Sequence, residues 1–194
     1  QHIKNGDELT LQDYEGPWGI LDDPKLAYLM GIVAGDGTFA EGSACVDVWG
    51  RDKVLCDLLE EFVSDSLDRH SDKYVLRTSA TRNPKFSYYD GQDKARLTSG
   101  PLGQVFLHHG FNPDTKCQVP ELVWKGNRKT VSAYLAGLYA ADATLQGGEM
   151  TVVSLANNSL EFVKDLQILW QNFGVPSSIN RIKENDKESF PDGK

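Results

Sequence analysis

The sequence predicts an α+β fold with antiparallel strand pairing, and an internal repeat is the main observation behind this prediction. Residues 27–38 (AYLMGIVAGDGT) and 133–144 (AYLAGLYAADAT) are identical at seven of twelve positions, at a separation of 106 residues. Each copy is followed by a short apolar strand and then by a helix with an apolar face. Helix, hairpin and helix in this order are typical of an antiparallel α+β architecture and not of a parallel wound sheet.

In the first copy, Asp22 or Asp23 caps a helix over 24–35, with Pro24 in its first turn. A hairpin is expected over 38–49, followed by a helix that Asp52 caps. The apolar face of that helix is predicted to carry Val54, Leu55, Leu58, Leu59 and Phe62. Further elements follow at intervals set by turn residues: strands at 74–79, 86–89 and 95–99, and a helix from Pro101 that Ser99 caps and Gly110 ends.

The second copy is shorter. A connection over 112–127 leads to a helix at about 130–141 and a strand at Val152 and Val153. The last helix is predicted to begin at an Asn158 cap, with Glu161 completing a capping box, and to end at Gly174. Nothing after it corresponds to the strand at 95–99 or to the helix that follows Pro101, so the second half is expected to be incomplete.

Length and composition describe an ordinary globular protein. The chain has 194 residues, 25% of them charged, and a mean hydropathy of −0.42. Three cysteines without CxxC spacing argue against a disulfide framework and against a zinc ribbon. No apolar run reaches the roughly 20 residues that span a bilayer, and the N-terminus has no signal pattern, so we expect a cytoplasmic protein without a membrane partner.

The net charge of −8 hides an uneven distribution. Residues 1–68 hold 4 Lys and Arg against 15 Asp and Glu, whereas residues 69–194 hold 16 against 13. The segment 69–96 is especially basic. Local positive charge decides whether a polyanion binds, so nucleic acid is not excluded by the overall charge, although a solvated surface is the other interpretation of such a run.

Each repeated helix ends in an aspartate, Asp36 or Asp142, where the helix dipole disfavours a carboxylate. Small residues at 31 and 35, and at 137 and 141, would let the two helices approach closely. The two carboxylates would then lie together with free carbonyl groups, which is a hard-oxygen site suited to Mg²⁺. An ordinary crossing of small-residue helices is the alternative interpretation.

These residues resemble a known family. Residues 29–37 (LMGIVAGDG) and 135–143 (LAGLYAADA) are similar to the two copies of the LAGLIDADG motif of homing endonucleases, and residues 116–124 (KCQVPELVW) resemble a block of endonuclease domains within inteins. The resemblance implies two pseudo-symmetric αββαββα halves, the second incomplete, around the motif helices. It divides the chain into an N-terminal extension (1–20) that could adjoin a splicing domain, a first subdomain with linker (21–127) and a second subdomain (128–194).

The resemblance also implies a site-specific double-strand DNA endonuclease that uses Mg²⁺ or another divalent metal such as Mn²⁺. Asp36 and Asp142 would be catalytic metal ligands, with the backbone carbonyls of Gly35 and Ala141. Lys116 matches the family's basic catalytic residue, and no second-half residue matches it. Ala143 stands where the motif usually has glycine, and strain in a left-handed turn is expected there.

The implied partner is double-stranded DNA, bound by a monomer with a pseudo-dimeric core; an intein splicing domain or a host protein is the further implied partner. The candidate DNA-binding residues are basic: Arg77, Arg82, Lys85, Lys94, Arg96, Lys125, Arg128, Lys129, Arg181 and Lys183. Three alternatives stay open on the same fold: a degenerate endonuclease, an RNA maturase and a transcription regulator, all without cleavage of DNA. A structural helix-pair module without nucleic acid is a further alternative.

Overall fold

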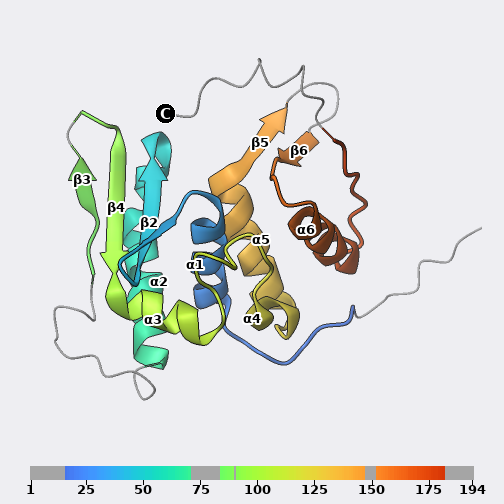
Figure 1. Ribbon diagram of the computed structural model, residues 1–194, viewed down its shortest axis with the longest axis horizontal. Helices are drawn as coiled ribbons and strands as arrows, with labels where there is room; N and C mark the ends of the chain where they lie inside the picture. The colour runs from blue at the N-terminus through green and yellow to red at the C-terminus, as the bar shows by residue number, and fades with distance from the viewer. Residues whose placement is uncertain (1–15, 71–83, 90, 147–151, 182–194) are drawn as a thin grey trace, which may run out of the picture.

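Two helices lie side by side at the centre of the molecule, and the other elements are arranged around them (Figure 1). The computed structural model describes residues 16–70, 84–89, 91–146 and 152–181. The central helices are α1 (Pro24–Gly35) and α5 (Arg128–Asp142), which carry the two copies of the repeat. Their packing against each other is the most extensive contact between elements of the described fold.

Side-chain caps fix where the central helices begin. The Asp23 carboxylate accepts a hydrogen bond from the backbone N–H of Leu26, and Pro24 fills the first turn, as predicted. The Asn127 side chain accepts one from the N–H of Thr130, so α5 begins slightly earlier than expected. Each such cap contributes about 1 kcal/mol of helix stability.

The first half contains a four-stranded antiparallel sheet in the order β1-β2-β4-β3. Its strands are β1 (Thr38–Ala40), β2 (Ser43–Trp49), β3 (Ser87–Tyr89) and β4 (Lys94–Ser99). Glu41 and Gly42, both with positive φ, form the tight turn of the predicted hairpin between β1 and β2. The helices α2 (Cys56–Arg69) and α3 (Gly100–His108) lie beside this sheet (Figure 1), and Ser99 caps α3 as expected.

The predicted start of α2 is wrong, and its predicted apolar face is correct only in part. Leu59 is buried and Leu55 and Phe62 pack against the core, whereas Val54 and Leu58 are exposed. Residues Gly50–Leu55 form a 3₁₀ helix, η1, so Asp52 lies inside that helix and caps nothing. A 3₁₀ helix has three residues per turn, and it therefore shifts the phase of the 3.6-residue pattern that was counted through it. As a result Val54 is 82% exposed, and the fully buried positions of α2 are Cys56, Leu59, Val63, Ser66 and Leu67.

The second half is built from α5, the hairpin β5 (Ala143–Gln146) and β6 (Val152–Leu155), and α6 (Leu160–Asn172). The predicted cap of α6 is one residue off: Ser159 Oγ accepts the N–H of Phe162, which leaves Glu161 at a position where it cannot complete a capping box. Gly174 adopts a positive φ after the helix, as expected. The described elements confirm an α+β fold in which the second half is smaller than the first.

The segment that precedes α1 packs on the linker before α5 and on the second half. Gly19 and Leu21 donate backbone hydrogen bonds to the carbonyls of Gly126 and Lys125, and Trp18 packs against Phe173 with ring centroids 4.6 Å apart. The predicted strand at 74–79 lies outside the described residues. Among the described helices, none combines the length and the apolar character needed to cross a membrane.

Candidate metal and nucleic-acid site

The two central helices touch through glycine. A Cβ added at Gly31 would lie 2.7 Å from the backbone nitrogen of Leu138, and one added at Gly137 would lie 3.1 Å from that of Ile32. Both distances are shorter than ordinary van der Waals contact. The two backbones therefore pack directly on each other, as the small-residue positions predicted.

This close packing continues to the C-terminal ends of the helices. A Cβ at Gly35 would lie 2.6 Å from the Cβ of Ala141 and 3.2 Å from that of Asp142. Asp36 is the C-cap of α1 and Asp142 is the last residue of α5, so the two carboxylates are neighbours at the point where the helices end together.

The backbone conformation after the helix differs between the two copies of the repeat. Ala143 has φ −88° and ψ 147°, so it is extended, and the strained left-handed turn expected there is absent. In the first copy Gly37 is required for space: a Cβ would lie 2.5 Å from Val33 Cα and 2.8 Å from the Cys45 carbonyl. The glycine of the motif thus serves packing, and the alanine of the second copy costs no backbone strain.

A short loop brings Lys116 to the same place. The Asn112 and Thr115 side chains bond to the backbone within this loop, and Thr115 also bonds to the carbonyl of Gly110. Phe111, at the start of the loop, packs against Phe39 of β1, with ring centroids 5.6 Å apart. The loop is therefore held by its own hydrogen bonds and by the packing of Phe111, which fixes where Lys116 projects.

The Lys116 ammonium donates hydrogen bonds to two backbone carbonyls, those of Gly35 at 3.2 Å and Gly37 at 2.7 Å. It therefore lies against the turn that carries Asp36, about 80 residues away along the chain. The structure brings together the three residues for which a catalytic role was predicted. It also shows that Lys116 already bonds to one carbonyl that was predicted to bind metal.

The electrostatics of this cluster are those of a cation site. Loss of surrounding water at the crowded helix ends raises the pKa of Asp36, the Asp142 carboxylate raises it further, and Lys116 opposes both effects. Burial likewise raises the pKa of Asp142, against the charge of Lys116. Two carboxylates and one ammonium leave a net negative charge, so a divalent cation would stabilise both ionised aspartates.

The donor atoms fit a hard cation. Asp36 and Asp142 supply carboxylate oxygens, and the ends of the two helices supply backbone carbonyl oxygens. No cluster of three or more His, Cys, Asp and Glu suited to a metal is found in the described part of the chain. Oxygen donors without imidazole or thiolate suit Mg²⁺ or Mn²⁺ better than Zn²⁺.

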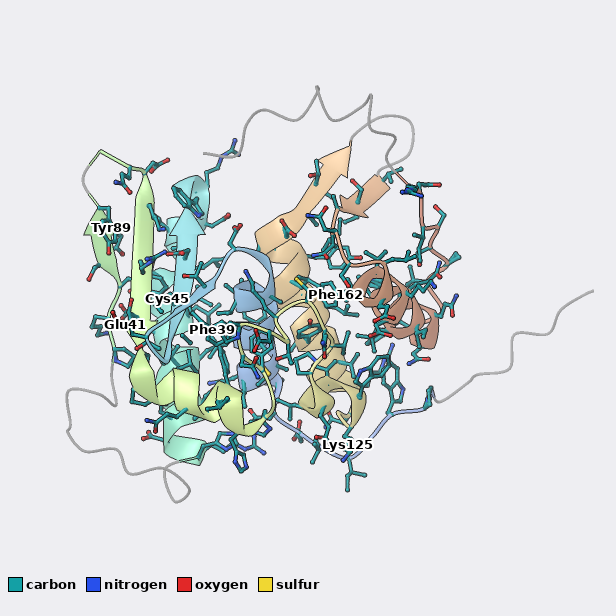
Figure 2. All side chains as sticks on the ribbon, viewed as in Figure 1. Phe39, Glu41, Cys45, Tyr89, Lys125 and Phe162 are labelled. Atoms are coloured by element: carbon teal, nitrogen blue, oxygen red, sulfur yellow. The ribbon has the colours of Figure 1, made fainter. Side chains whose placement is uncertain are left out.

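The predicted DNA-binding residues fall in three groups. Arg77, Arg82 and Lys183 lie outside the described residues. Lys85 pairs with Glu60, Lys125 (Figure 2) pairs with Glu121, and the guanidinium of Arg128 lies 5.6 Å from the ring centre of Phe173. Lys129 and Arg181 are exposed, and Lys94 and Arg96 lie on β4 of the first sheet.

Sequence reasoning missed Asp47, which binds two of these basic residues. Asp47 lies on β2 and accepts hydrogen bonds from Arg96, and Lys94 lies 3.2 Å from the same carboxylate. The pairing depends on the register between β2 and β4, which are separated by a helix and by residues 71–83. A polar residue between Val46 and Val48 in an apolar strand was the available signal.

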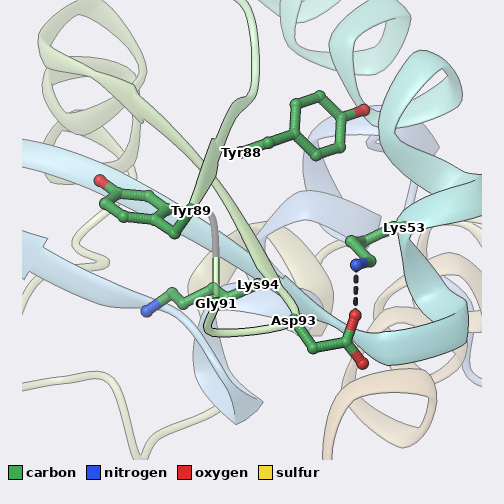
Figure 3. A pocket seen from close by; sticks show the side chains of 6 residues that line it. All are labelled: Lys53, Tyr88, Tyr89, Gly91, Asp93 and Lys94. Carbon is green, nitrogen blue, oxygen red and sulfur yellow. Dashed lines mark hydrogen bonds and ion pairs between the residues drawn. The ribbon is translucent and has the colours of Figure 1, made fainter.

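A shallow pocket lies at one end of the same sheet (Figure 3). It is lined by Lys53, Tyr88, Tyr89, Gly91, Asp93 and Lys94. Lys53 pairs with Asp93 across its floor. The pocket is wide open, so it offers an aromatic and basic surface next to the strand face and not an enclosed ligand cavity.

Comparison with known proteins agrees with this geometry. Residues 129–191 match the family described as LAGLIDADG-like domain. The chain is similar in structure to a variant of the homing endonuclease I-DmoI, which was crystallised with its nicked target DNA in the presence of Mn. The superposition covers 84% of each chain, with a TM-score of 0.56 and 14% sequence identity. The chain therefore has the fold of a LAGLIDADG homing endonuclease.

Curated relatives are much longer proteins. The chain is 32% identical over 197 residues to the ribonucleoside-diphosphate reductase NrdEB subunit alpha of Bacillus subtilis (strain 168), which covers 99% of the chain and 18% of the relative. It is 23% identical over 188 residues to the tRNA-splicing ligase RtcB of Methanopyrus kandleri, covering 83% of the chain and 18% of the relative. The chain thus spans less than a fifth of these relatives.

Proposed function

We propose that this chain is a LAGLIDADG homing endonuclease that hydrolyses phosphodiester bonds at a specific double-stranded DNA site with a divalent metal. The observation that carries the proposal is the convergence of Asp36, Asp142 and Lys116 at the end of the glycine-packed helix pair. In this proposal the subdomains are 21–127 and 128–194, acting as a monomer with a pseudo-dimeric core in the cytoplasm.

The chain's own residues would divide the chemistry between them. Asp36 and Asp142 would hold the metal through carboxylate oxygens, with the carbonyls of Gly35 and Ala141 as further donors. When bound, the divalent ion supplies Lewis-acid stabilisation of the phosphoryl oxygens and lowers the pKa of an attacking water. Lys116, oriented by the carbonyls of Gly35 and Gly37, would offset the negative charge that develops on the scissile phosphate.

The relatives support a further part of the proposal, that the chain is an inserted segment of an intein in a longer host. A ribonucleotide reductase chain and a tRNA-splicing ligase bear names of unrelated activities. Each nevertheless shares one block with this chain, and that block is less than a fifth of the relative's own length. A block common to otherwise unrelated proteins is what a mobile insert produces. Mass spectrometry of the longer protein that carries this chain would show the segment excised and its flanks joined.

One observation favours a second candidate, a binder that does not cleave. Lys116 donates to the carbonyl of Gly35, so a metal at the two aspartates would share that oxygen with an ammonium or displace it. On this alternative the helix pair and the basic residues are kept for binding nucleic acid, as in a degenerate endonuclease, an RNA maturase or a transcription regulator.

Cleavage of a randomised plasmid library separates the two candidates. With Mg²⁺ or Mn²⁺ the protein is expected to produce discrete ends, which sequencing would map to one site. Asp36→Asn and Asp142→Asn should abolish these ends and retain salt-sensitive binding of DNA, whereas Asp68→Asn, an exposed carboxylate near the C-terminal end of α2, should leave cutting unchanged. Retention of DNA without ends for the unmodified protein would favour the binder.

A further inference from the structure

One face of the first sheet carries polar side chains. Ala44, Val46 and Val48 of β2 belong to the hydrophobic core. Side chains alternate along a strand, so Cys45, Asp47 and Trp49 project from the opposite face. We call this the outer face.

Strand register determines which residues meet on the outer face. Asp47 pairs with Arg96 of β4, which pairs in turn with Ser87 of β3. Trp49 pairs with Lys94, which pairs with Tyr89. Figure 3 shows Tyr89 and Lys94 on one side of the strand pair and Tyr88 on the other.

Asp47 is the buried centre of this face. Its side chain is 3% exposed, and its two carboxylate oxygens accept hydrogen bonds from Nε and Nη2 of Arg96, both at 2.7 Å. Lys94 Nζ lies 3.2 Å from one of those oxygens and 4.7 Å from the ring centre of Trp49. The group of one carboxylate and two cations keeps a net positive charge, so the acid does not make this face repel a polyanion.

The geometry leaves one edge of the Arg96 guanidinium for a ligand. A guanidinium is a rigid plane with two edges that can each form a pair of parallel hydrogen bonds. Asp47 takes the edge formed by Nε and Nη2, and no hydrogen bond of Nη1 is found in the described part of the chain. The side chain is 30% exposed, whereas its carboxylate partner is covered. The edge formed by Nη1 and Nη2 is therefore held in a fixed orientation for an external acceptor pair.

The matching acceptor pair in DNA is the O6 and N7 of guanine, which both face the major groove. Other base edges in that groove do not present two adjacent acceptors. A backbone phosphate can also accept a pair of hydrogen bonds from a guanidinium, so the experiment must distinguish a phosphate from guanine. The location also fits a DNA-binding face. Thr38, two residues after Asp36, pairs with Cys45, and Asp47 lies about 7 Å further along β2.

We propose that Arg96 reads one guanine in the major groove of the target site and that Asp47 is a positioning residue that orients Arg96 without touching DNA. This inference rests on the proposed function as a DNA-binding protein. It assigns different roles to neighbouring polar residues: Arg96 contacts the base, Asp47 orients Arg96, and Lys94 offsets the charge of Asp47. The competing explanation is that the ion-pair cluster only stabilises the sheet.

The test selects double-stranded DNA from a randomised duplex pool by retention on the protein in metal-free buffer, followed by sequencing. The wild-type pool should contain one position where guanine is preferred by about 5-fold to 150-fold, the range expected for a bidentate contact. Arg96→Lys should weaken the preference at that position alone, because a lysine can contact guanine but lacks the rigid fork that Asp47 orients. Asp47→Asn should reduce it at the same position, and the double variant should lose no more than Arg96→Lys does.

Two controls separate orientation from stability. Lys25→Gln breaks an ion-pair cluster of one cation and two carboxylates that joins α1 to α2, and it should leave every base preference unchanged. Urea unfolding of each variant shows whether it is folded under the conditions of selection. Because Arg96→Lys keeps a cation beside Asp47, it remains informative if Asp47→Asn fails to fold.

Three outcomes would overturn the proposal. If Arg96→Lys prefers the same guanine as strongly as the wild type does, the proposed base contact is rejected although DNA binding is intact. If Arg96→Lys instead weakens DNA binding equally for all sequences, Arg96 contacts a phosphate and not a base. If the wild-type protein retains no DNA at any salt concentration, the proposed function and this inference fall together.

Discussion

Replacing Gly137 with alanine tests the packing that brings the two aspartates together. A Cβ at this position would lie 2.2 Å from the carbonyl oxygen of Tyr28 and 3.1 Å from the nitrogen of Ile32, both atoms of the α1 backbone. The nearer distance is more than about 1 Å short of ordinary contact, and a helix backbone cannot rotate aside as a side chain can. The helices would therefore have to separate.

The magnitude follows from two opposing contributions. Overpacking of a core costs about 1–3 kcal/mol, and clashes with backbone atoms lie toward the upper end of that range. Alanine in place of glycine stabilises a helix by about 0.5–1 kcal/mol. We expect Gly137→Ala to lower the free energy of unfolding by about 2 kcal/mol, which for a chain of this length lowers the Tm by about 4–8 °C.

Urea unfolding with and without Mn²⁺ measures both consequences. Separation of the helices should also weaken the stabilisation that Mn²⁺ gives, because the two carboxylates move apart. Ala136→Gly is the matched control: it is exposed on the same helix and should cost about 1 kcal/mol without changing the effect of Mn²⁺. A Gly137→Ala protein as stable as the wild type would refute direct backbone packing of α1 on α5.

Three further predictions concern charge, catalysis and capping. Burial raises the pKa of Asp47, but the paired cations outweigh burial and hold this pKa below its usual value. The stabilising contribution of Asp47 is therefore present above about pH 4 and is lost as the pH falls through the lowered pKa. In urea titrations from pH 7 to 2, Asp47→Asn should lose less of its stability at acid pH than the wild type does. Lys116→Gln should slow DNA cleavage by about 100-fold or more in a gel assay and leave the Mn²⁺-dependent rise in Tm in place. Ser159→Ala should destabilise the protein by about 1 kcal/mol in chemical unfolding, whereas Asn158→Ala should change stability by less than about 0.5 kcal/mol.

Local signals predicted the central elements well. The helix at 24–35 follows from the repeat together with its Asp23 cap, whose hydrogen bond spans only three positions along the chain. The repeat also predicts the helix at about 130–141, which the structure extends to Arg128–Asp142. The hairpin over 38–49 follows from alternation and a glycine turn. The error at α2 has a cause that the local pattern could not show, because Gly50 adopts φ 53° and donates a hydrogen bond to the carbonyl of Asp93, 43 residues further along the chain.

The candidate site shows the same contrast between features that local signals predict and features that depend on distant contacts. Asp36 and Asp142 are found from the sequence because the repeat places them at matched helix ends, and Lys116 is found from its surrounding block. The role of Asp47 could not be found, because it depends on the register of two strands that are joined through a helix and a long connection. Alternation predicts which residues share a face, and only pairing decides which of them meet.

The two ends of the helix pair differ in electrostatic balance, and this difference links stability to metal binding. At the N-terminal end, Asp23 caps α1, donates its backbone N–H to Thr130 of α5 and pairs with His70, so each charge and dipole there has a favourable partner. At the C-terminal end, Asp36 and Asp142 oppose both helix dipoles and each other, and Lys116 offsets only part of that cost. A divalent cation at this end would remove the repulsion and satisfy the dipoles together. Under the proposed function, metal binding should therefore raise the stability of the helix pair itself, since the fold places its unfavourable charges where the ion is needed.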